Sequence, residues 1–417
     1  MHDVRMKGFR ERADVETVEA FLEAQTGALS SEPVELLACV GRVLAEDVDS
    51  QFDVPGFPRS AMDGYAVRGE DTFGAGNYDE LSLEVLGLSL PGAPFEGSVA
   101  SGQAVRIMTG ARVPEGADAV VMAEVCEERD GRVAVRDAVA PRKNVGLPGE
   151  DIRTGARVLA AGRRLRPQDA GLLASIGRAS VSCVRRPRVR LVVTGDELLP
   201  AGQPPETSGA KIVDSNSVVL RALVERDGGQ VLPFEILPDR VEVIREALAD
   251  AAGDVVLVSG GSSVGQEDHA PGLLAELGSL DFHGISMRPS SPAGVGRIDA
   301  RFVFLLPGNP VSCLCAYEFF AGPTLRALGG RPRRWPHPRV QLPLAQKIAS
   351  AIGRTDYVRV SIEKGKVTPL ATSGASILSS TVRAAGCVIV PRELEGMPAG
   401  QGVEVLLYDD NQPPGGD

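Results

Sequence analysis

Aromatic residues are scarce in this chain of 417 residues, since Phe, Trp and Tyr together make up 4%. Val, Leu and Ala must therefore fill any hydrophobic core. Positive charge is also in deficit, because 44 Lys and Arg stand against 55 Asp and Glu, for a formal net charge of −11. Nucleic-acid binding as a main activity needs a dominant positive field, so we expect no such partner. A small anionic ligand in a local basic pocket stays compatible with this composition.

Paired cysteines and long apolar runs are missing as well. The six cysteines are scattered, none belongs to a zinc-type pair of pairs, and a chain of this size does not favour a disulfide framework. Cys313 and Cys315 lie in an apolar run, which favours core packing. No stretch approaches the ~20 apolar residues of a membrane span. The N-terminal residues lack the apolar segment of a secretory signal, so we expect a cytoplasmic protein without a membrane anchor.

The first half of the chain predicts a β domain inserted into a mixed region. Hydrophobic residues make up 43% and charged residues 24%, which is a globular composition with room for two to four domains. Residues 1–50 and 143–186 are assigned to an N-terminal linking domain, with helices at Asp14–Ala24, capped by Asp14, and Pro167–Ile176. Residues 51–142 are cut by Gly and Pro into short apolar runs, which predict strands at Leu81–Leu86, Val105–Met108, Ala119–Val125 and Arg132–Val135.

Strands and helices alternate from residue 187 to residue 331. Strands are expected at Val189–Val193, Val231–Leu237, Asp254–Ser259 and Phe302–Leu306. Helices are expected at Ser217–Arg226, Arg240–Ala251, His269–Leu277 and Val311–Leu328. This alternation predicts an α/β domain, a doubly wound and mostly parallel sheet with helices on both faces. Ligands on such sheets bind at the carboxyl ends of the strands.

The last part of the chain predicts a second β domain. Arg331–Pro338 is rich in Pro and Arg and is interpreted as a linker, in which His337 is expected to be exposed. Apolar runs at Val358–Ile362, Val388–Val390 and Val403–Leu407 predict a small C-terminal β-barrel domain over residues 335–410, and residues 411–417 are expected to be disordered. The fold class is therefore multidomain α/β plus β.

Three loops at predicted strand ends carry polar residues. Thr194–Glu197 offers two carboxylates, although an ordinary turn explains it equally well. Ser259–Asp268 is rich in Gly and Ser, so its backbone N–H groups can approach an anion, and Asp268 can cap the following helix or hold a cation. A generic turn is the alternative there. Leu306–Pro310 has Asn309 as a helix cap and Pro310 at the first helical position, which a purely structural role explains, although its backbone can also line a pocket.

Three further polar turns lie in the first half of the chain, at Ser60–Ala66, Arg106–Ala111 and Gly149–Asp151. Each one alone favours a turn over a site. In order along the chain, however, these phrases resemble the molybdopterin molybdenumtransferases, called MoeA in bacteria and gephyrin E-domain in animals. The matching stretches are SAMDGYAVR (Ser60–Arg68), RIMTGARVPEGADAVV (Arg106–Val121), GED (Gly149–Asp151), TGDELLPAG (Thr194–Gly202), IVDSN (Ile212–Asn216), SGGSSVGQED (Ser259–Asp268) and LPGNPVS (Leu306–Ser312).

The resemblance implies an activity and a set of ligands. Members of the family insert molybdate into adenylated molybdopterin with release of AMP, during molybdenum cofactor biosynthesis. They resemble one another in a four-domain subunit that forms a homodimer, whose α/β domain is of the molybdopterin-binding type. The implied cofactor is Mg²⁺. Possible partners are the molybdopterin adenylyltransferase that makes the substrate and the molybdoenzymes that receive the product.

The resemblance also implies site residues. Five positions match family residues important for activity, namely Asp63, Thr109, Asp151, Glu197 and Asp268. The carboxylates are expected to hold metal, Glu197 and Asp268 above all, or to order the attacking species, while Thr109 hydrogen-bonds substrate. The phosphate or pterin is expected on the loops that carry Gly260, Gly261, Ser262, Ser263, Gly265, Pro307, Gly308, Asn309 and Pro310. Because the family site is built partly between subunits, Asp63 is expected to serve the α/β domain of a second copy.

The anion site departs from the family pattern. Where the family has two lysines that bind molybdate, this chain has Arg288 and Ser291. Arg288 keeps the charge, whereas Ser291 offers only a hydrogen bond. Arg359 matches an arginine that the family uses for the anion, and Ser376 is displaced by one residue from the matching serine. This departure leaves open a catalytically weakened scaffold protein. A nucleotide-processing hydrolase on the same α/β domain is a further alternative.

Overall fold

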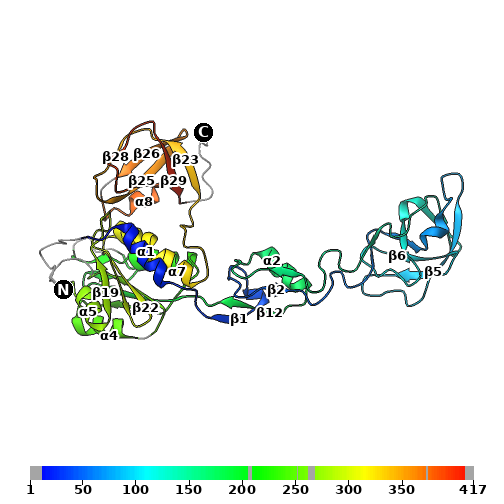
Figure 1. The fold of residues 1–417 in the computed structure, drawn as a ribbon, viewed down its shortest axis with the longest axis horizontal. Helices are drawn as coiled ribbons and strands as arrows, with labels where there is room; N and C mark the ends of the chain where they lie inside the picture. Colours follow the sequence, from blue (N-terminus) through cyan, green and yellow to red (C-terminus); the bar gives the residue numbers. More distant parts are fainter. Residues whose placement is uncertain (1–11, 205–208, 251, 262–267, 372–373, 409–417) are drawn as a thin grey trace. The chain divides into compact units, whose positions relative to one another are not determined.

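The computed structural model describes residues 12–204, 209–250, 252–261, 268–371 and 374–408 (Figure 1). The chain divides into two compact units. Unit 1 comprises residues 1–32, 41–43 and 183–417, and unit 2 comprises residues 33–40 and 44–182. None of the described helices is both long enough and apolar enough to cross a membrane.

Unit 2 is built around a six-stranded sheet. Its strand order is β7 (Ala119–Met122), β4 (Gly64–Val67), β6 (Gln103–Ile107), β5 (Leu81–Ser89), β9 (Arg132–Val135) and β8 (Cys126–Arg129). Alternate side chains of these short strands enter two small cores, which contain mainly Val and Ala, with Leu83, Ile107 and Tyr65. The apolar run after residue 119 is shorter than expected as a strand, because Ala123–Val125 forms a 3₁₀ turn, η3.

The rest of unit 2 consists of short strand pairs and one helix. β2 (Val48–Asp49) pairs with β11 (Arg157–Leu159), and β3 (Arg59–Ser60) pairs with β10 (Val145–Gly146). Helix α2 (Pro167–Ser175) begins with proline at its first position, where the missing N–H leaves no partner unsatisfied, and packs near the 3₁₀ turn η1 (Leu36–Ala38). The pair of β1 (Ser31–Glu35) and β12 (Ser180–Val184) lies where the chain passes between the units.

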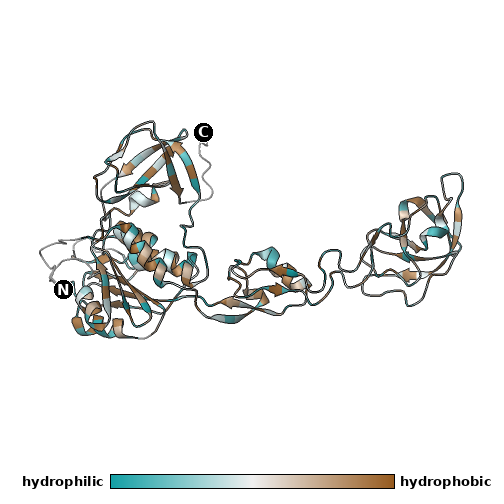
Figure 2. Ribbon diagram, viewed as in Figure 1, coloured by the Kyte–Doolittle hydropathy of each residue, from teal (hydrophilic) through white to brown (hydrophobic). Residues whose placement is uncertain are grey.

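The central sheet of unit 1 combines a parallel half and an antiparallel half. The parallel strands are β16 (Gln230–Val231), β13 (Arg188–Thr194), β18 (Val255–Ser259) and β22 (Arg301–Leu306), in that order. The antiparallel strands β21 (Gly294–Ile298) and β19 (Ser279–His283) follow β22. β18 and β22 are buried along their whole length, which explains the apolar runs Val255–Val258 and Phe302–Leu306 within them (Figure 2).

Helices cover both faces of this sheet (Figure 1). One face packs against α1 (Val15–Gln25), α3 (Asn216–Arg226), α6 (Pro310–Ala316) and α7 (Gly322–Leu328). The other face packs against α4 (Val241–Ala249) and α5 (Ala270–Leu277). The doubly wound fold expected from the sequence is confirmed. Asp14 makes no cap hydrogen bond at α1 and forms an ion pair with Arg392 instead.

Two expected elements are interrupted at prolines. The edge strand expected at Val231–Leu237 consists of β16 and β17 (Ile236–Leu237), which both pair with β13. Pro233 lies between them and has no N–H to donate to the sheet. The helix expected over Val311–Leu328 contains a π-helical turn, η4 (Tyr317–Ala321), between α6 and α7. Pro323 lacks the N–H that would bond back into this turn, which accounts for a change of helical pitch here.

The C-terminal part of unit 1 is a second six-stranded sheet with its own core. Its order is β20 (Met287–Arg288), β25 (Thr355–Glu363), β27 (Gly386–Val390), β29 (Gly402–Leu407) and β23 (Arg339–Pro343), and β26 (Lys366–Ala371) pairs with β25. The Ala345 N–H donates to the Val367 carbonyl over 2.8 Å, so the chain after β23 returns to β26. This bond curls the sheet in the manner of a small barrel. β24 (Ile348–Ala349), β28 (Gly396–Met397) and the short helix α8 (Ser379–Val382) complete it.

The expectation that His337 is exposed was wrong. Its side chain is 9% exposed, Nδ1 lies 3.0 Å from the Leu407 carbonyl oxygen, and Nε2 lies 3.4 Å from Oε1 of Glu318. Trp335 packs edge-on against Phe319 at 4.9 Å. The segment read as a linker therefore anchors two aromatic rings, which its Pro and Arg content concealed.

Candidate functional site

A pocket of about 490 Å³ opens at the carboxyl ends of β13, β18 and β22. The loops after these three strands contribute Thr194 and Glu197, Ser259 to Gly261, and Gly308 to Pro310. Asp268 and Ser376 complete that side of the wall. The three polar loops noted in the sequence therefore line one pocket, because parallel strands bring their carboxyl ends to one edge of the sheet.

Gly260 shows why a small residue is required at this edge. Its φ is +97°, and a Cβ atom built there would lie 2.3 Å from the carbonyl oxygen of Thr194. On its other side, the Cα of Gly260 lies 3.9 Å from the Cβ position of Gly308. The loops after β13 and β18 can therefore approach one another this closely only because residue 260 is glycine, and the loop after β22 lies in ordinary contact with it.

Asn216, the first residue of α3, connects two of these loops. Its Nδ2 group donates to Ser259 Oγ over 3.1 Å and to the Gly308 carbonyl over 2.8 Å. Asp214, just before it, accepts a hydrogen bond from the Ser217 N–H over 3.1 Å and so steadies the start of the helix. Both Asp214 and Asn216 are buried and line the pocket. β14 (Leu198–Leu199) pairs with β15 (Ile212–Val213) and brings this stretch to the wall.

Four carboxylates line the pocket, namely those of Glu197, Asp214, Asp239 and Asp268. Only Glu197 and Asp268 were expected. The described residues contain no group of three His, Cys, Asp or Glu side chains placed to hold a metal on their own. A divalent cation that keeps water and phosphate oxygens as ligands needs only one or two carboxylates, and the pocket contains more than that number.

Two polar atoms in the pocket wall have no protein partner among the residues that the structure describes. They are the buried Oγ1 of Thr194 and Oδ1 of Asp239, whose other oxygen accepts from the Asp196 N–H over 3.3 Å. A buried polar group without a partner is unfavourable, so atoms of this kind are suited to a ligand or to ordered water.

Asp214, Asn216 and Asp239 were not among the site residues expected from the sequence. The first two belong to the IVDSN stretch already noted, and Asp239 follows the last residues of the edge strand β17. The signal that could have identified them as pocket residues was their position next to the end of a strand. Ser262, Ser263 and Gly265, which were expected on the phosphate loop, lie outside the described residues.

The residues expected at the anion site are only partly gathered here. Ser376 lines the pocket. Arg359 lies on β25, is 2% exposed and donates from Nη1 to the Gly374 carbonyl over 3.3 Å. Ser291 Oγ is buried and has no partner within the described part of the chain.

Arg288 is engaged elsewhere. It lies on β20, which pairs with β25, and its Nη2 lies 2.5 Å from Oδ2 of the buried Asp356. Asp356 also accepts from Ser350 over 2.9 Å and from Arg354 over 3.0 Å. The guanidinium of Arg288 therefore already neutralises a buried carboxylate of the second sheet.

In unit 2, Asp63 and Thr109 lie side by side. Asp63 Oδ1 accepts from both the N–H and the hydroxyl of Thr109, each over 2.7 Å. The Thr109 N–H, followed by its hydroxyl, lowers the pKa of Asp63 below 3.8, so the exposed carboxylate is ionised near neutral pH. Because the hydroxyl proton of Thr109 is committed to Asp63, this oxygen can offer a substrate only its lone pairs.

Asp151 is not brought to this pair. Ser60 pairs with Val145, and Arg59 pairs with Gly146, in antiparallel register. The turn that bears Asp63 and the turn that bears Asp151 therefore leave β3 and β10 at opposite ends of the strand pair. Asp151 itself is exposed.

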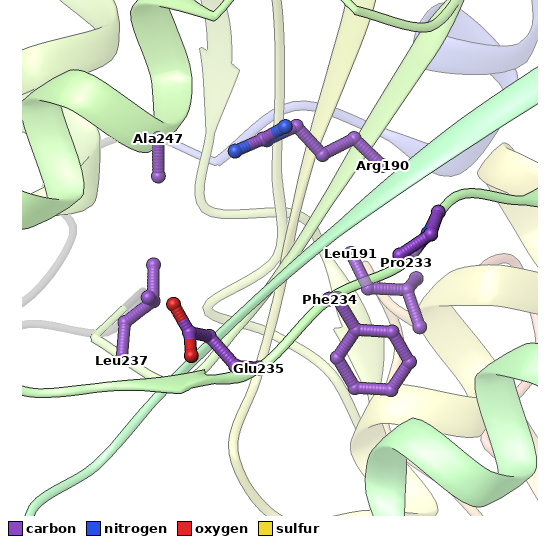
Figure 3. Close-up of a pocket in the computed structure, with 7 residues that line it drawn as sticks. All are labelled: Arg190, Leu191, Pro233, Phe234, Glu235, Leu237 and Ala247. Atoms are coloured by element: carbon purple, nitrogen blue, oxygen red, sulfur yellow. The ribbon is translucent and has the colours of Figure 1, made fainter.

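A second cavity, of about 340 Å³, lies where Pro233 interrupts the edge of the central sheet (Figure 3). Arg190 and Glu235 provide its charged walls, and Leu191, Phe234, Leu237 and Ala247 provide apolar ones. Asp250 pairs with Arg190, whose buried Nε has no partner within the described ranges. No residue expected from the sequence lies there.

Three family models match this chain. The MoeA N-terminal region (domain I and II) matches residues 13–177, the probable molybdopterin binding domain matches 190–327, and the MoeA C-terminal region (domain IV) matches 341–408. Together they cover most of the sequence.

Individual proteins are similar along nearly their whole length. A molybdopterin molybdenumtransferase from Haemophilus influenzae is 34% identical over 91% of this chain and 94% of its own length. Another from Staphylococcus epidermidis is 31% identical over 91% of each. Two crystal structures of a molybdopterin biosynthesis moeA protein from Pyrococcus horikoshii, 32% identical, give TM-scores of 0.81 and 0.77. They cover 96% and 95% of this chain and 100% of their own.

Proposed function

This chain belongs to the MoeA family of molybdopterin molybdenumtransferases, enzymes of molybdenum cofactor biosynthesis, and from that premise we propose that it inserts molybdate into adenylated molybdopterin and releases AMP. One observation supports the proposal that this substrate binds here. The pocket at the carboxyl ends of β13, β18 and β22 combines a glycine edge, four carboxylates and two polar atoms that have no partner in the described part of the chain. An anionic phosphate accompanied by a cation suits that combination.

The pocket residues receive distinct roles. The backbone at Gly260 and Gly261 can approach the phosphates closely, since no Cβ stands in the way. Thr194 Oγ1 can donate to a phosphate oxygen, and Asn216 keeps the loops of β18 and β22 at a fixed separation. These groups hold the phosphoanhydride in place and orient it for attack, which is the main protein contribution to phosphoryl chemistry.

Glu197 and Asp268 would hold Mg²⁺ in this pocket. Bound beside the substrate, Mg²⁺ neutralises charge on the phosphate oxygens. Asp214 is already engaged with the start of α3, so its contribution is to orient the wall. Asp239 has one oxygen without a partner among the described residues, and this oxygen can accept a hydrogen bond from a substrate N–H or O–H group.

We assign molybdate to the side of the pocket where Ser376 lies, with Arg359 as its principal cation. Arg359 is nearly completely buried, so its charge is little screened. Arg288 would have to share its guanidinium between molybdate and Asp356. Ser291 supplies no charge, so the anion would be held more weakly than by two free cations.

A second copy of the chain is proposed to complete the site. Unit 2 exposes Phe52, Phe57, Met62 and Leu147 by 60%, 43%, 44% and 40%, near the turns of Asp63 and Asp151 in sequence. Large apolar side chains exposed to this extent are candidates for an interface. Covering it with another copy would place Asp63 and Asp151 at the edge of a buried contact.

We further propose a cytoplasmic location, with the adenylyltransferase that supplies the substrate and the molybdoenzymes that receive the product as partners. Cell fractionation and co-purification test these points. The catalytically weakened scaffold has no support beyond the altered Arg288 and Ser291 positions.

Molybdate-dependent AMP release from adenylated molybdopterin tests the activity directly. We expect release by the purified chain with Mg²⁺, and almost none from Asp268→Ala. Glu276→Ala, which removes an exposed carboxylate from the helix after Asp268, is the control and should release AMP normally. Partner binding without release by the unmodified chain would favour the scaffold.

Mixing two inactive variants tests the shared site. If Asp63 serves the α/β domain of a second copy, Asp63→Ala and Asp268→Ala dimers should regain activity after subunit exchange, because one of the two sites in a mixed dimer is intact. Mixtures that stay inactive, although exchange is verified, would rule out this arrangement.

A further inference from the structure

In unit 2 the contact between Asp63 and Thr109, which we call a clamp, joins one carboxylate oxygen to the N–H and the hydroxyl of one threonine. The unit contains a second clamp of this kind. Asp53 Oδ1 accepts from the Thr154 N–H over 2.7 Å and from the Thr154 hydroxyl over 2.9 Å. In both clamps one carboxylate oxygen receives the two donors of a single threonine. Sequence reasoning selected Asp63 and passed over Asp53, which lies in the same Pro-rich stretch.

The clamp at Asp53 closes the turn that carries Asp151. Val54 donates to the Ile152 carbonyl over 2.7 Å, and the Asp151 N–H donates back to the Val54 carbonyl over 3.1 Å. The Gly149 N–H donates to the Pro55 carbonyl over 2.9 Å. Asp151 is therefore held between two backbone contacts, with Thr154 fastened just beyond it.

Gly149 fits tightly against the carboxylate of Asp53. Its φ is +69°, and a Cβ atom there would lie 3.2 Å from Oδ1 of Asp53. The absence of a side chain at Gly149 thus lets the turn fold over Asp53. Glycine serves here both for its left-handed conformation and for the close approach.

The other support of the turn is weaker. Glu150 accepts from the Leu147 N–H over 3.1 Å and pairs with Arg59 over 3.2 Å, but both charged side chains are more than 40% exposed. Exposed ion pairs contribute about 0–1 kcal/mol. The N–H and the hydroxyl of Thr154 both donate to the ionised carboxylate of Asp53. Hydrogen bonds to a charged group of this kind are stronger than the exposed ion pair between Arg59 and Glu150. The Thr154 N–H and then its hydroxyl lower the pKa of Asp53 below 3.8, so the clamp is charged near neutral pH.

The side chain of Asp151 is left available by this arrangement. Its carboxylate is exposed and forms no hydrogen bond or ion pair with the residues that the structure describes. A backbone fixed on both sides with an uncommitted carboxylate is what a group needs to meet a substrate in a set position.

We propose that Asp53 is a positioning residue for the transferase reaction, which acts through Thr154 to fix the turn that presents the Asp151 carboxylate. This inference rests on the proposed function, in which Asp151 acts on the substrate. The carboxylate of Asp53 bonds to Thr154 and not to substrate. Its effect on the reaction therefore passes through the position of Asp151.

Isosteric variants of the full-length chain separate the two donors. Thr154→Val keeps the N–H and removes the hydroxyl, whereas Thr154→Ser keeps both. Asp53→Asn keeps the shape and removes the charge. Asp71→Asn is the matched control, because Asp71 is a half-buried carboxylate of the same unit that accepts from the Ser101 hydroxyl over 3.0 Å and the Gly102 N–H over 2.9 Å.

Amide hydrogen exchange measures the clamp without any substrate. In Asp53→Asn and Thr154→Val, the amides of Gly149, Asp151 and Ile152 should exchange faster, while Thr154→Ser and Asp71→Asn should leave them unchanged. Unaltered exchange at this turn in Asp53→Asn would overturn the inference, whatever the activity.

AMP release then measures the consequence. We expect kcat to fall by roughly 10- to 100-fold in Asp53→Asn, as for a reacting group displaced by about an ångström, and to stay normal in Thr154→Ser and Asp71→Asn. The decisive comparison is the double variant. In an Asp151→Asn background, Asp53→Asn should cause no further loss, because its effect passes through Asp151.

A full additional loss in that background would show that Asp53 acts by another route, and the positioning role would be abandoned. A normal kcat in the single variant Asp53→Asn would also refute the positioning role. If the unmodified chain releases no AMP while exchange at Gly149–Ile152 still responds to Asp53→Asn, the proposed function fails and the clamp stands.

Discussion

The side-chain amide of Asn216 donates to the carbonyl oxygen of Gly308 over 2.8 Å, and so joins the start of α3 to the loop after β22. The same amide reaches Ser259 at the end of β18 over 3.1 Å. A single buried side chain thus sets the spacing between two loops that wall the pocket. The geometry of the pocket depends on a residue that has no reactive group of its own.

Asn216→Ala should therefore impair both stability and activity. Loss of a buried amide that serves two partners costs about 1–3 kcal/mol, and denaturant unfolding measures this. The rate of AMP release should fall as well, because the loops that hold the phosphates lose their spacing. Arg221→Ala, on the exposed side of α3, is the control. If Asn216→Ala matched that control in both assays, the bridging role would be refuted.

Gly260→Ala should abolish AMP release. The new Cβ would lie 2.3 Å from the Thr194 carbonyl oxygen, at a φ of +97° that side chains rarely adopt, so the loop must move. Gly272→Ala provides the contrast, because that helical glycine has no heavy atom within 4 Å of the added Cβ. It should stabilise α5 by about 0.5–1 kcal/mol and leave activity intact. Equal behaviour of the two alanines in AMP release would show that close approach at Gly260 is irrelevant.

The sequence was sufficient to locate the pocket because strand ends are a local property. Continuous apolar runs such as Val255–Ser259 identify buried parallel strands, and the loops that follow such strands meet at one edge. The antiparallel strand β21, which pairs with β19, was not expected. It carries glycines at Gly294 and Gly296 and only part of a β pattern.

Long-range pairing was beyond sequence reasoning. Arg288 pairs with Asp356, which lies 68 residues later, and no local pattern indicates that β20 joins the second sheet. His337 is buried by contacts from Glu318 and Leu407, which also come from distant elements. The division into four domains and the roles of Asp63 and Asp151 stay predictions.

Ser291→Lys should lower the molybdate concentration that gives half-maximal AMP release. A charge-assisted contact is worth about 1–3 kcal/mol, which corresponds to roughly 5- to 150-fold in affinity. The buried Oγ of Ser291 has no partner within the described residues, so the substitution breaks no hydrogen bond there. Ser291→Met, of similar length but without charge, is the control. An unchanged molybdate dependence in Ser291→Lys would remove this position from the anion site.

The buried carboxylate of Glu318 should make stability depend on pH in the acid range. Burial raises its pKa, but hydrogen bonds from His337 and Arg226 outweigh burial and lower the pKa from 4.5 to about 2. Between these values the unfolded chain binds more protons than the folded chain. The stabilisation is therefore complete above about pH 4.5 and is lost as the pH falls towards 2, by about 3 kcal/mol.

Glu318→Gln should flatten this acid dependence, since the amide does not titrate. Its stability at neutral pH should be lower than that of the unmodified chain, because Arg226 loses the charge that lies 2.6 Å from its Nη1 in the buried network. Glu404→Gln removes an exposed ion pair with Arg339 and should leave the profile nearly unchanged. The measurement is the free energy of unfolding in urea at pH values from 7, where Glu318 is ionised in both states, down to about 3, where the folded and unfolded chains differ in proton uptake. An equally steep acid loss in Glu318→Gln would mean that other carboxylates govern the transition. A flattened profile would place the pH sensitivity of this fold in the π-helical turn between α6 and α7.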